Sequence, residues 1–364
     1  MSLPVGVESP AAARVSIAMA SYNGERFIEE QLNSLASQTH APYELVVCDD
    51  QSTDRTQQLV ESFAARVSFP VRFIRNPDRL YFSSNFMKAA GLCTGDFIAF
   101  CDQDDIWDPR KIEASLQALA QPGVVLCVHD ATKVDDAGNV VGLETRRVPK
   151  GIVHALDPFM VFSGFTCTFP RGLIELLPPD RRPMDVIETK RKLSHDRWIC
   201  YLASLVGSIA NLDESLALYR QHHDNAAGWM RQRRGKAELF DSFRNKFGFY
   251  LQKRLRIISD FRRLSEEISL DGLHAEIFSA ERLEIGRDRL RRYEEIFERR
   301  YAIAKPDSRF VRLRNLAKCW REGVYEDPIS GETSRRSAVM DGLGALLARR
   351  GQADSASRRL AQSA

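Results

Sequence analysis

Residues 96–109 read DFIAFCDQDDIWDP, an apolar run followed at once by an acidic turn. The first six residues of the stretch predict a buried strand. Three carboxylates in four residues follow it, at Asp102, Asp104 and Asp105. Asp108-Pro109 then opens a predicted helix, with proline at a position where its missing N–H group costs nothing. The stretch is therefore a strand, an acidic turn and the start of a helix.

Outward from this stretch, short apolar runs alternate with amphipathic segments of helical spacing. The predicted strands are Val15–Ala20, Leu45–Cys48, Val71–Ile74 and Asp96–Cys101, and the predicted helices between them are Glu25–Ser37, Asp54–Arg66 and Ser83–Leu92. This alternation predicts an α/β fold with a mostly parallel sheet flanked by helices. Ligands bind such sheets beyond the carboxyl ends of the strands, where SYNG, DDQSTD and DQDD stand. No GxGxxG follows the first strand, which disfavours a dinucleotide-binding Rossmann site.

The 364 residues divide into an acidic front and a basic back. Up to Gly228 the chain has 22 Lys and Arg against 29 Asp and Glu, and from Trp229 it has 30 against 20. This asymmetry predicts two parts with different tasks. We expect a catalytic α/β domain at 1–228, an α-helical extension at 229–350, and a disordered tail at 351–364 with too few apolar residues to pack. The helices predicted in the extension are Lys236–Ile268, Ala275–Tyr301 and Arg309–Trp320.

Composition argues against a membrane-spanning, secreted or disulfide-bonded protein. No stretch reaches the ~18–20 apolar residues that cross a bilayer, and the longest candidate, Trp198–Ala210, is predicted to be a buried helix. The N-terminus lacks the basic and apolar segments of a signal peptide. The seven cysteines are scattered without a CxxC pair, which makes zinc and disulfide sites weak hypotheses. A cytoplasmic location fits these features best.

The acidic turn is a candidate metal site. Neighbouring carboxylates repel one another unless a cation is present, and Mg²⁺ or Mn²⁺ accepts such oxygens together with substrate phosphates. The alternative is an acidic turn that leads into the helix cap at Asp108. Asp50, after the second strand, is placed either to accept hydrogen bonds from a base or ribose or to serve the turn before the next helix. Tyr22, after the first strand, is placed to stack on a nucleobase.

Two further clusters carry candidate chemistry. His195-Asp196 stands before the apolar run Trp198–Leu205. Asp196 is a candidate general base at a helix start, and the alternative is a surface pair that caps the helix. Arg220-Gln221-His222-His223 offers an imidazole to Mn²⁺ or Mg²⁺ and a guanidinium to a phosphate, and the alternative is a set of exposed residues.

In this order the pieces resemble the family 2 inverting glycosyltransferases, in particular the bacterial rhamnosyltransferase-like branch. The resemblance runs from about Val15 to Gly228 and rests on VSIAMASYNGERFIEEQLNSLASQ, ELVVCDDQSTDRT, SSNFMKAAGLCTGDFIAFCDQDDIWDPRKI, SHDRW and LYRQHHDNAAG. The combination of DQDDIW with DDQSTD is its most specific part. Members of the family have a GT-A fold, in which two abutting halves form one α/β domain.

The resemblance implies roles for the donor side. Tyr22 and Asp50 match positions that hold the base and ribose, and Asn85 matches an asparagine that faces the nucleotide. Asp102 and Asp104 match the DxD element, which engages the ribose and a metal-bound diphosphate. Asp104 is similar to the direct metal ligand of that element.

For the acceptor side, the resemblance makes Asp196 the catalytic base of a single displacement that inverts the anomeric carbon. His222 matches a histidine that can complete the metal site, and His223 stands where family members more often have a small residue, so the two histidines compete as ligands. The metal and Arg220 are then expected to stabilise the departing diphosphate. SGFTCTFPR, at 163–171, resembles an acceptor-side loop.

The donor and the acceptor stay open. By branch resemblance dTDP-rhamnose is the leading donor and UDP-linked hexoses come next, with a hydroxyl of a glycan or lipid-linked acceptor receiving the sugar in cell-surface polysaccharide synthesis. A sugar-phosphate nucleotidyltransferase is one alternative, although SYNGER is a poor version of the glycine-rich basic loop that it needs. A non-catalytic sugar-nucleotide-binding scaffold subunit is another. Nucleic acid is not an expected partner, because basic residues interleave with acidic ones and no recognised module is present.

The extension has its own open question. Lys236–Ile268 carries aromatic and aliphatic residues on one helical stripe among many basic residues. The stripe can pack as ordinary core, form a homo-oligomer, or bind the anionic inner surface of the cell membrane, where lipid-linked acceptors sit.

Overall fold

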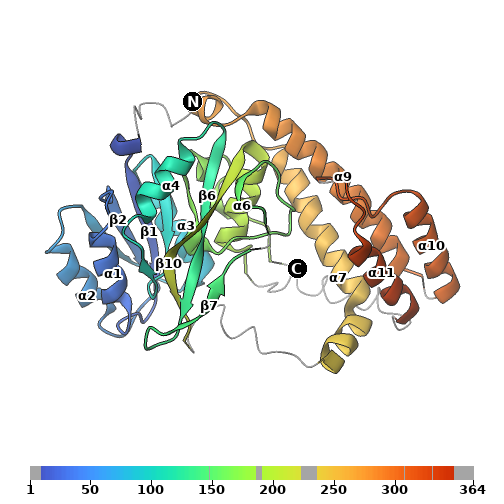
Figure 1. The fold of residues 1–364 in the computed structure, drawn as a ribbon, viewed down its shortest axis with the longest axis horizontal. Coiled ribbons are helices and arrows are strands. Elements are labelled where there is room, and N and C mark those ends of the chain that lie inside the picture. The colour runs from blue at the N-terminus through green and yellow to red at the C-terminus, as the bar shows by residue number, and fades with distance from the viewer. Residues whose placement is uncertain are drawn as a thin grey trace. The chain divides into compact units, whose positions relative to one another are not determined.

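The structure is a computed structural model that describes residues 10–146, 148–185, 191–222, 236–306, 308–329 and 331–347. The chain forms two compact units (Figure 1). The first contains residues up to 182, 192–230 and 268–283, and the second contains 183–191, 231–267 and 284–364. The predicted domain boundary at residue 228 and the predicted disordered tail at 351–364 lie outside the described residues and stay predictions.

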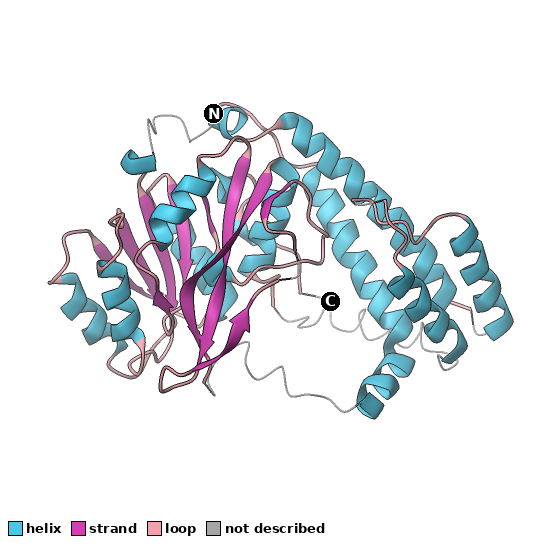
Figure 2. Cartoon of the chain, viewed as in Figure 1, coloured by secondary structure: helices cyan, strands magenta, loops and turns pink. Residues whose placement is uncertain are grey.

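Four parallel strands form one half of the sheet. They are β1 (Val15–Ser21), β2 (Glu44–Asp49), β3 (Val71–Arg75) and β4 (Phe97–Cys101). Their order is β3-β2-β1-β4, so the ends of β1, β2 and β4 stand side by side (Figure 2). Each matches a predicted strand within about one residue at either end. This half confirms the α/β fold expected from the sequence.

The other half of the sheet is mixed. Its strands are β5 (Ile106–Trp107), β6 (Val124–Val134), β7 (Val140–Glu144), β8 (Gly151–Val153), β9 (Thr168–Pro170) and β10 (Ser208–Arg220). β9 runs antiparallel between β4 and β6, and β10 is parallel to β6. β10 also pairs with the short β5, with Leu218 opposite Ile106. That pairing brings the end of β10 beside the acidic turn.

Helices cover both faces of the sheet. α1 (Ile28–Ala36), α2 (Thr56–Ala64) and α4 (Lys111–Leu119) pack on one face, and α3 (Tyr81–Leu92) and α6 (His195–Val206) pack on the other. A one-turn helix, α5 (Gly172–Glu175), packs against α6. The arrangement completes the layered fold that the alternation of elements predicts.

Two predicted helix boundaries are wrong. α1 begins at Ile28 instead of Glu25, because the N–H groups of Phe27 and Ile28 both bind the carbonyl of Gly24 in a turn. The predicted helix Trp198–Ala210 ends at Val206, and residues from Ser208 belong to β10. Gly207 separates the two, and a Cβ atom there would lie only 2.5 Å from the side chain of Val125.

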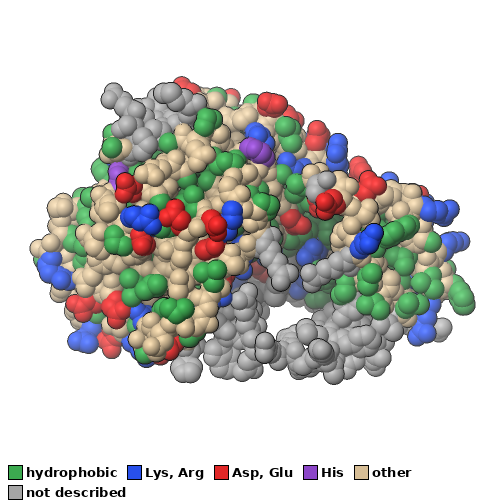
Figure 3. Space-filling model, in the orientation of Figure 1, with side chains coloured by type: hydrophobic (Ala, Val, Ile, Leu, Met, Phe, Trp, Pro, Cys, Tyr) green, Lys and Arg blue, Asp and Glu red, His purple; other side chains and the backbone are tan. Residues whose placement is uncertain are grey.

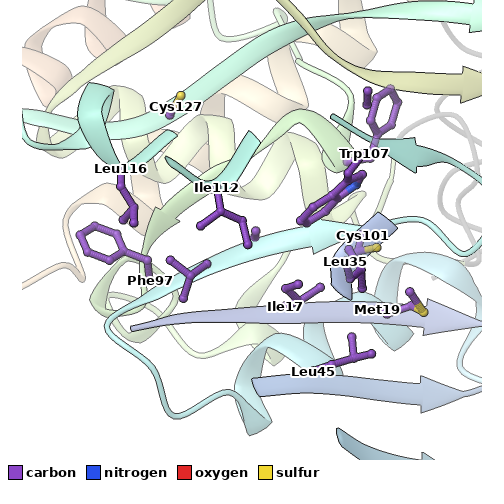
Figure 4. Close-up of a cluster of buried hydrophobic side chains, with 14 of the residues drawn as sticks. Ile17, Met19, Leu35, Leu45, Phe97, Cys101, Trp107, Ile112, Leu116 and Cys127 are labelled. Atoms are coloured by element: carbon purple, nitrogen blue, oxygen red, sulfur yellow. The ribbon is translucent and has the colours of Figure 1, made fainter. Parts of the chain in front are cut away.

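A buried cluster fixes both ends of the acidic turn (Figure 4). Cys101, at the end of β4, is fully buried, and Trp107, two residues after the turn, is 2% exposed. Burial of a large apolar side chain contributes about 1.5–3 kcal/mol. All seven cysteines are buried and free. The residues labelled in Figure 4 are Ile17, Met19, Leu35, Leu45, Phe97, Cys101, Trp107, Ile112, Leu116 and Cys127.

The C-terminal part of the chain is helical. Its helices are α7 (Lys236–Ser265), α8 (Leu273–Ile277), α9 (Ala280–Ala304), α10 (Arg309–Arg321) and α11 (Arg335–Leu347). The region predicted as one helix at Ala275–Tyr301 is divided between α8 and α9. Over the described residues, none of these helices is both long enough and apolar enough to cross a membrane.

Most of the aromatic stripe of α7 packs as core where the structure describes it, while Tyr250 of the stripe is 47% exposed. Phe247, Leu251, Ile258 and Phe261 are all at most 1% exposed. The stripe is therefore not available for membrane or subunit contact at these positions. α9 and α11 are further joined by a buried ion pair, in which Arg300 donates to both oxygens of Asp341 at 2.8 and 3.0 Å.

Candidate active site

A cleft of about 450 Å³ opens beyond the carboxyl ends of β1, β2 and β4. Six of the eight predicted site residues line it: Tyr22, Asp50, Asn85, Asp102, Asp104 and Asp196. They come from five separate segments of the first unit. The strand order predicts that residues at the strand ends meet at one edge of the sheet, and in the structure they line one cavity.

The loops at the base of the cleft are tied to one another. The side-chain amide of Gln103 accepts a hydrogen bond from the N–H of Tyr22 at 2.9 Å and donates one to its carbonyl at 3.0 Å. Gly24 lies beside it, and a Cβ atom there would stand 2.4 Å from the Gln103 oxygen, so a larger residue would have to displace this amide. Asn23, in a left-handed conformation, accepts a hydrogen bond from the N–H of Thr53. The turn after β1 is thus locked to both other loops.

Asp50 and Asn85 also organise the cleft. The carboxylate of Asp50 accepts hydrogen bonds from the N–H groups of Leu80 and Tyr81 at 2.6 and 2.8 Å. Asn85 donates to the carbonyl of Cys48 at 2.7 Å. Both side chains line the cavity while holding its wall, and because Asn76 also donates to Asp50 at 3.1 Å, one lone pair of that carboxylate is left for a ligand.

Two arginines that were not among the predicted site residues also line the cleft. The guanidinium of Arg79 lies 3.9 Å from the ring centre of Tyr22 and 3.9 Å from a carboxylate oxygen of Asp50. Arg146 pairs with Glu144 at 3.0 Å and donates to Ser163 at 3.1 Å. Arg79 follows β3, so the rule of strand ends could have found it. Arg146 follows β7, a strand that the sequence analysis did not predict.

The acidic turn meets the end of β10. Nε2 of His222 lies 2.6 Å from Oδ2 of Asp104. The pKa of Asp102 is raised to about 7, because burial disfavours its charged form and because Asp104 lies close by. Asp105 is fully buried; one oxygen accepts the N–H of Arg220, and the other finds no hydrogen-bond partner among the described residues. The turn concentrates negative charge that a cation would relieve.

Arg220 lies beneath the turn and is not among the residues that line the cleft. Its guanidinium binds Glu30 at 2.6 Å and the carbonyl of Asp104 at 3.1 Å, and it stacks 4.6 Å from the ring centre of Phe27. Only 3% of the residue is exposed. Its predicted contact with a diphosphate stays a prediction, and what the structure shows is support of the acidic turn. His223, the competing metal ligand, lies outside the described residues.

The metal hypothesis can be tested against the donor set. Within the described residues, no group of three His, Cys, Asp or Glu side chains forms a ready metal cage. Mg²⁺-type sites need only one or two protein carboxylates when substrate phosphates supply the rest. Asp104 and His222 would hold such an ion, since their side chains already meet in a hydrogen bond of 2.6 Å and together offer one carboxylate and one imidazole. The residues present fit such an ion.

Asp196 lines the cleft from the start of α6. Asp196 is half-buried, and one of its oxygens accepts the N–H of Arg197 at 2.7 Å. Buried Arg182 donates to Ser83 at the start of α3 and to the carbonyl of Leu193. This clamp fixes the beginnings of the two helices together, so the wall that bears Asp196 is preorganised.

His195 stands beside it in an aromatic cage. Its ring stacks on Phe86 at 4.1 Å, and Phe100 meets it edge-on at 5.0 Å. Neither ring nitrogen finds a hydrogen-bond partner among the described residues. Burial lowers the pKa of His195 to about 4, so the ring is neutral at physiological pH. The wall is thus formed by a carboxylate next to an uncharged imidazole.

Comparison with known proteins identifies relatives of the first unit. Residues 16–174 match the sequence model described as Glycosyl transferase family 2. EpsE of Bacillus subtilis, whose name assigns it to the glycosyltransferases, is 35% identical over 215 residues, which cover 58% of this chain and 74% of that protein. RfbG of Shigella flexneri, named a dTDP-rhamnosyl transferase, is 38% identical over 107 residues, which cover 28% of this chain and 36% of that protein.

Among solved structures, residues 1–349 of TarS from S. aureus superpose with a TM-score of 0.47 at 17% identity, over 76% of this chain and 91% of that one. This chain covers 59–74% of the length of the relatives that match more than half of it.

Proposed function

The chain belongs to glycosyltransferase family 2, and on that premise we propose that it transfers a sugar from a nucleoside-diphosphate sugar to an acceptor hydroxyl, with inversion at the anomeric carbon. The observation that carries the proposal is the shared cleft. Asp50, Asp102, Asp104 and Asp196 reach it from different segments, as a reaction between two bound substrates requires.

The nucleoside occupies the end of the cleft near Tyr22. The exposed ring of Tyr22 and the guanidinium of Arg79 present flat surfaces on which a base stacks. Asp50, fixed between two backbone N–H groups, accepts a hydrogen bond from the base or the ribose. Asn85 completes this wall and holds the loop behind it.

The diphosphate meets the acidic turn through a divalent cation, Mn²⁺ or Mg²⁺. Asp104 and His222 would hold the ion, and Asp102 faces the ribose and diphosphate. The ion supplies positive charge that stabilises the departing diphosphate. Arg220 keeps the turn in place through the carbonyl of Asp104 and the carboxylate of Asp105.

Asp196 acts as the general base. The acceptor oxygen attacks the anomeric carbon from the side of Asp196, which takes the hydroxyl proton, while the bond from that carbon to the diphosphate oxygen breaks. The products are the glycoside and the nucleoside diphosphate. The start of α6 suits a carboxylate, because the N-terminus of a helix stabilises negative charge.

The donor is dTDP-rhamnose, with UDP-hexoses as second choice, and the acceptor is a glycan or a lipid-linked sugar in the synthesis of a cell-surface polysaccharide. The name of RfbG supports the rhamnosyl donor over the part of the chain that it matches. The predicted cytoplasmic location suits such donors.

Incubation with a panel of nucleotide sugars and Mn²⁺ tests the proposal. We expect one donor to be hydrolysed slowly without acceptor, and the matching nucleoside diphosphate to raise the melting temperature only with metal. Release of pyrophosphate from a nucleoside triphosphate and a sugar phosphate would instead indicate a nucleotidyltransferase. Binding of a nucleotide sugar with no turnover under any acceptor condition would indicate a scaffold subunit.

A further inference from the structure

The second unit exposes an apolar surface on two neighbouring helices. Phe310 of α10 is 86% exposed, and Val339 of α11 is 61% exposed. Trp320, Leu343 and Leu346 are also exposed. Figure 3 shows hydrophobic side chains gathered over α10 and α11, with Lys and Arg side chains around them. We call the exposed side of these helices the α10–α11 face.

Helical spacing makes this side a coherent face of α10. Phe310, Arg314, Ala317 and Arg321 recur at intervals of four, three and four residues, so they share one side, and all four are exposed. The opposite side carries buried Arg312 and Cys319.

α11 repeats the pattern. Arg335, Val339, Leu343 and Leu346 recur at intervals of four, four and three residues, and all are exposed. Asp341 and Ala345, which point to the interior, are at most 1% exposed. Each helix therefore presents apolar side chains outward together with cations.

Four cations on these helices have no ion-pair partner within the part of the chain that the structure describes, and Arg321 donates only to the backbone carbonyl of Ala317 at 3.4 Å. Arg309, Arg314, Arg321 and Arg335 are exposed and form no ion pair there. Acidic groups of the same unit are used elsewhere. The pairs that use them are Glu294 with Arg262, Glu266 with Arg291, Asp341 with Arg300, and Glu322 with Arg299 and Lys318. Four arginines without an ion pair therefore lie on the two helices that expose apolar side chains, while the acidic residues near them stand in the connection at 322–334.

We propose that the α10–α11 face docks on an anionic lipid bilayer. Helices that lie in a membrane interface combine exposed Trp, Phe and Leu with Lys and Arg. A second copy of the chain fits this face poorly, because a self-complementary contact would bring like charges together. A nucleic acid would meet the cations but would leave the aliphatic row of α11 in water. The bilayer is the partner that satisfies both the apolar and the charged side chains.

The membrane contact proposed for α10 and α11 differs from the contact that the sequence suggested for α7. In the stripe of α7 that suggested membrane contact in the sequence, Phe247, Leu251, Ile258 and Phe261 are buried, and only the edge at Tyr250 is exposed among its described residues. Docking through α10 and α11 uses different side chains and does not depend on which sugar the first unit transfers.

Vesicle flotation of the full chain tests the proposal. The vesicles are phosphatidylcholine alone, and phosphatidylcholine with about one-third phosphatidylglycerol, each at low and high salt. We expect binding to the anionic vesicles at low salt and at least a tenfold loss at high salt. Arg314→Gln with Arg321→Gln should weaken binding by about 25-fold, since each cation near such a surface contributes about fivefold. Phe310→Ala with Trp320→Ala should also weaken it tenfold or more.

A matched control comes from exposed apolar residues of the first unit. Val140→Ala with Leu143→Ala, on β7, should leave vesicle binding unchanged. Equal binding to both kinds of vesicle, no binding to either, or α10 variants that bind as wild type would overturn the proposal. Light scattering distinguishes the remaining case: a dimer that Phe310→Ala dissociates, without vesicle binding, would assign the face to a second copy. Thermal unfolding of each variant confirms that its fold is retained.

Discussion

Nε2 of His222 lies 2.6 Å from Oδ2 of Asp104, although 118 residues separate them along the chain. The pairing of β10 with β5 brings them together, because β5 follows the acidic turn directly and β10 ends beside it. Neither side chain alone would hold a divalent ion firmly, and their contact makes a shared ion chemically reasonable.

Replacement of His222 by Ala tests this relationship. If His222 is a ligand, the concentration of Mn²⁺ needed for half-maximal donor hydrolysis should rise about 10–100-fold. A titration of activity with Mn²⁺ measures it. His40→Ala is the control, since His40 contacts the carbonyl of Ala13 away from the cleft. An unchanged Mn²⁺ requirement in the His222 variant would remove this histidine from the metal site.

Asp196→Asn tests the general base. The substitution keeps the shape of the side chain and removes its proton affinity, so kcat should fall about 10²–10⁴-fold. The melting-temperature rise produced by a nucleoside diphosphate with Mn²⁺ should be retained, because the role proposed for Asp196 concerns the acceptor and not the nucleotide. Asp213→Asn, at a side chain that is 81% exposed, should be near wild type in both assays. A near-normal kcat for the Asp196 variant would contradict the assigned role.

The same Gly→Ala substitution is expected to change stability in opposite directions at Gly24 and at Gly91. Gly24→Ala should displace the Gln103 amide from the backbone of Tyr22 and destabilise the fold by about 1–3 kcal/mol, with weaker nucleotide binding. Gly91→Ala, inside α3 and with no atom within 4 Å of the added carbon, should stabilise by about 0.5–1 kcal/mol. Urea unfolding measures both. Equal effects would show that the close contact at Gly24 is unimportant.

Burial of the His195 imidazole should make the free energy of unfolding depend on pH. Its pKa is lowered to about 4 in the folded chain, against 6.5 as its ordinary value. Between these values the unfolded chain binds more protons, so this residue makes stability rise with pH. The free energy of unfolding of His195→Phe, relative to that of wild type, should therefore rise by up to about 3 kcal/mol as pH falls from 6.5 to 4. Above pH 6.5 the difference between the two proteins should be constant.

Urea unfolding at several pH values checks this window. Phe82→Leu is the control, because it alters a neighbouring aromatic ring without removing an ionisable group, and its effect should not vary with pH. A difference between His195→Phe and wild type that is flat from pH 4 to 6.5 would show that the imidazole is not held neutral by burial.

The first four strands and the carboxylates that follow them could be predicted from the amino-acid sequence alone. These features are local: apolar runs set the strands, and parallel strands necessarily bring their carboxyl ends to one edge. Tyr22, Asp50, Asp102 and Asp104 could be placed in one cleft on that basis. The same rule would have found Arg79 after β3.

The tertiary structure decided what depends on contacts between distant segments. It buries the guanidinium of Arg220 under the acidic turn, sets His195 in an aromatic cage, and brings Arg146 to the cleft. It also covers most of the stripe of α7 and leaves Phe310 exposed. An amphipathic pattern states that a helix has an apolar side, and only the packing of its neighbours decides whether that side meets protein or solvent.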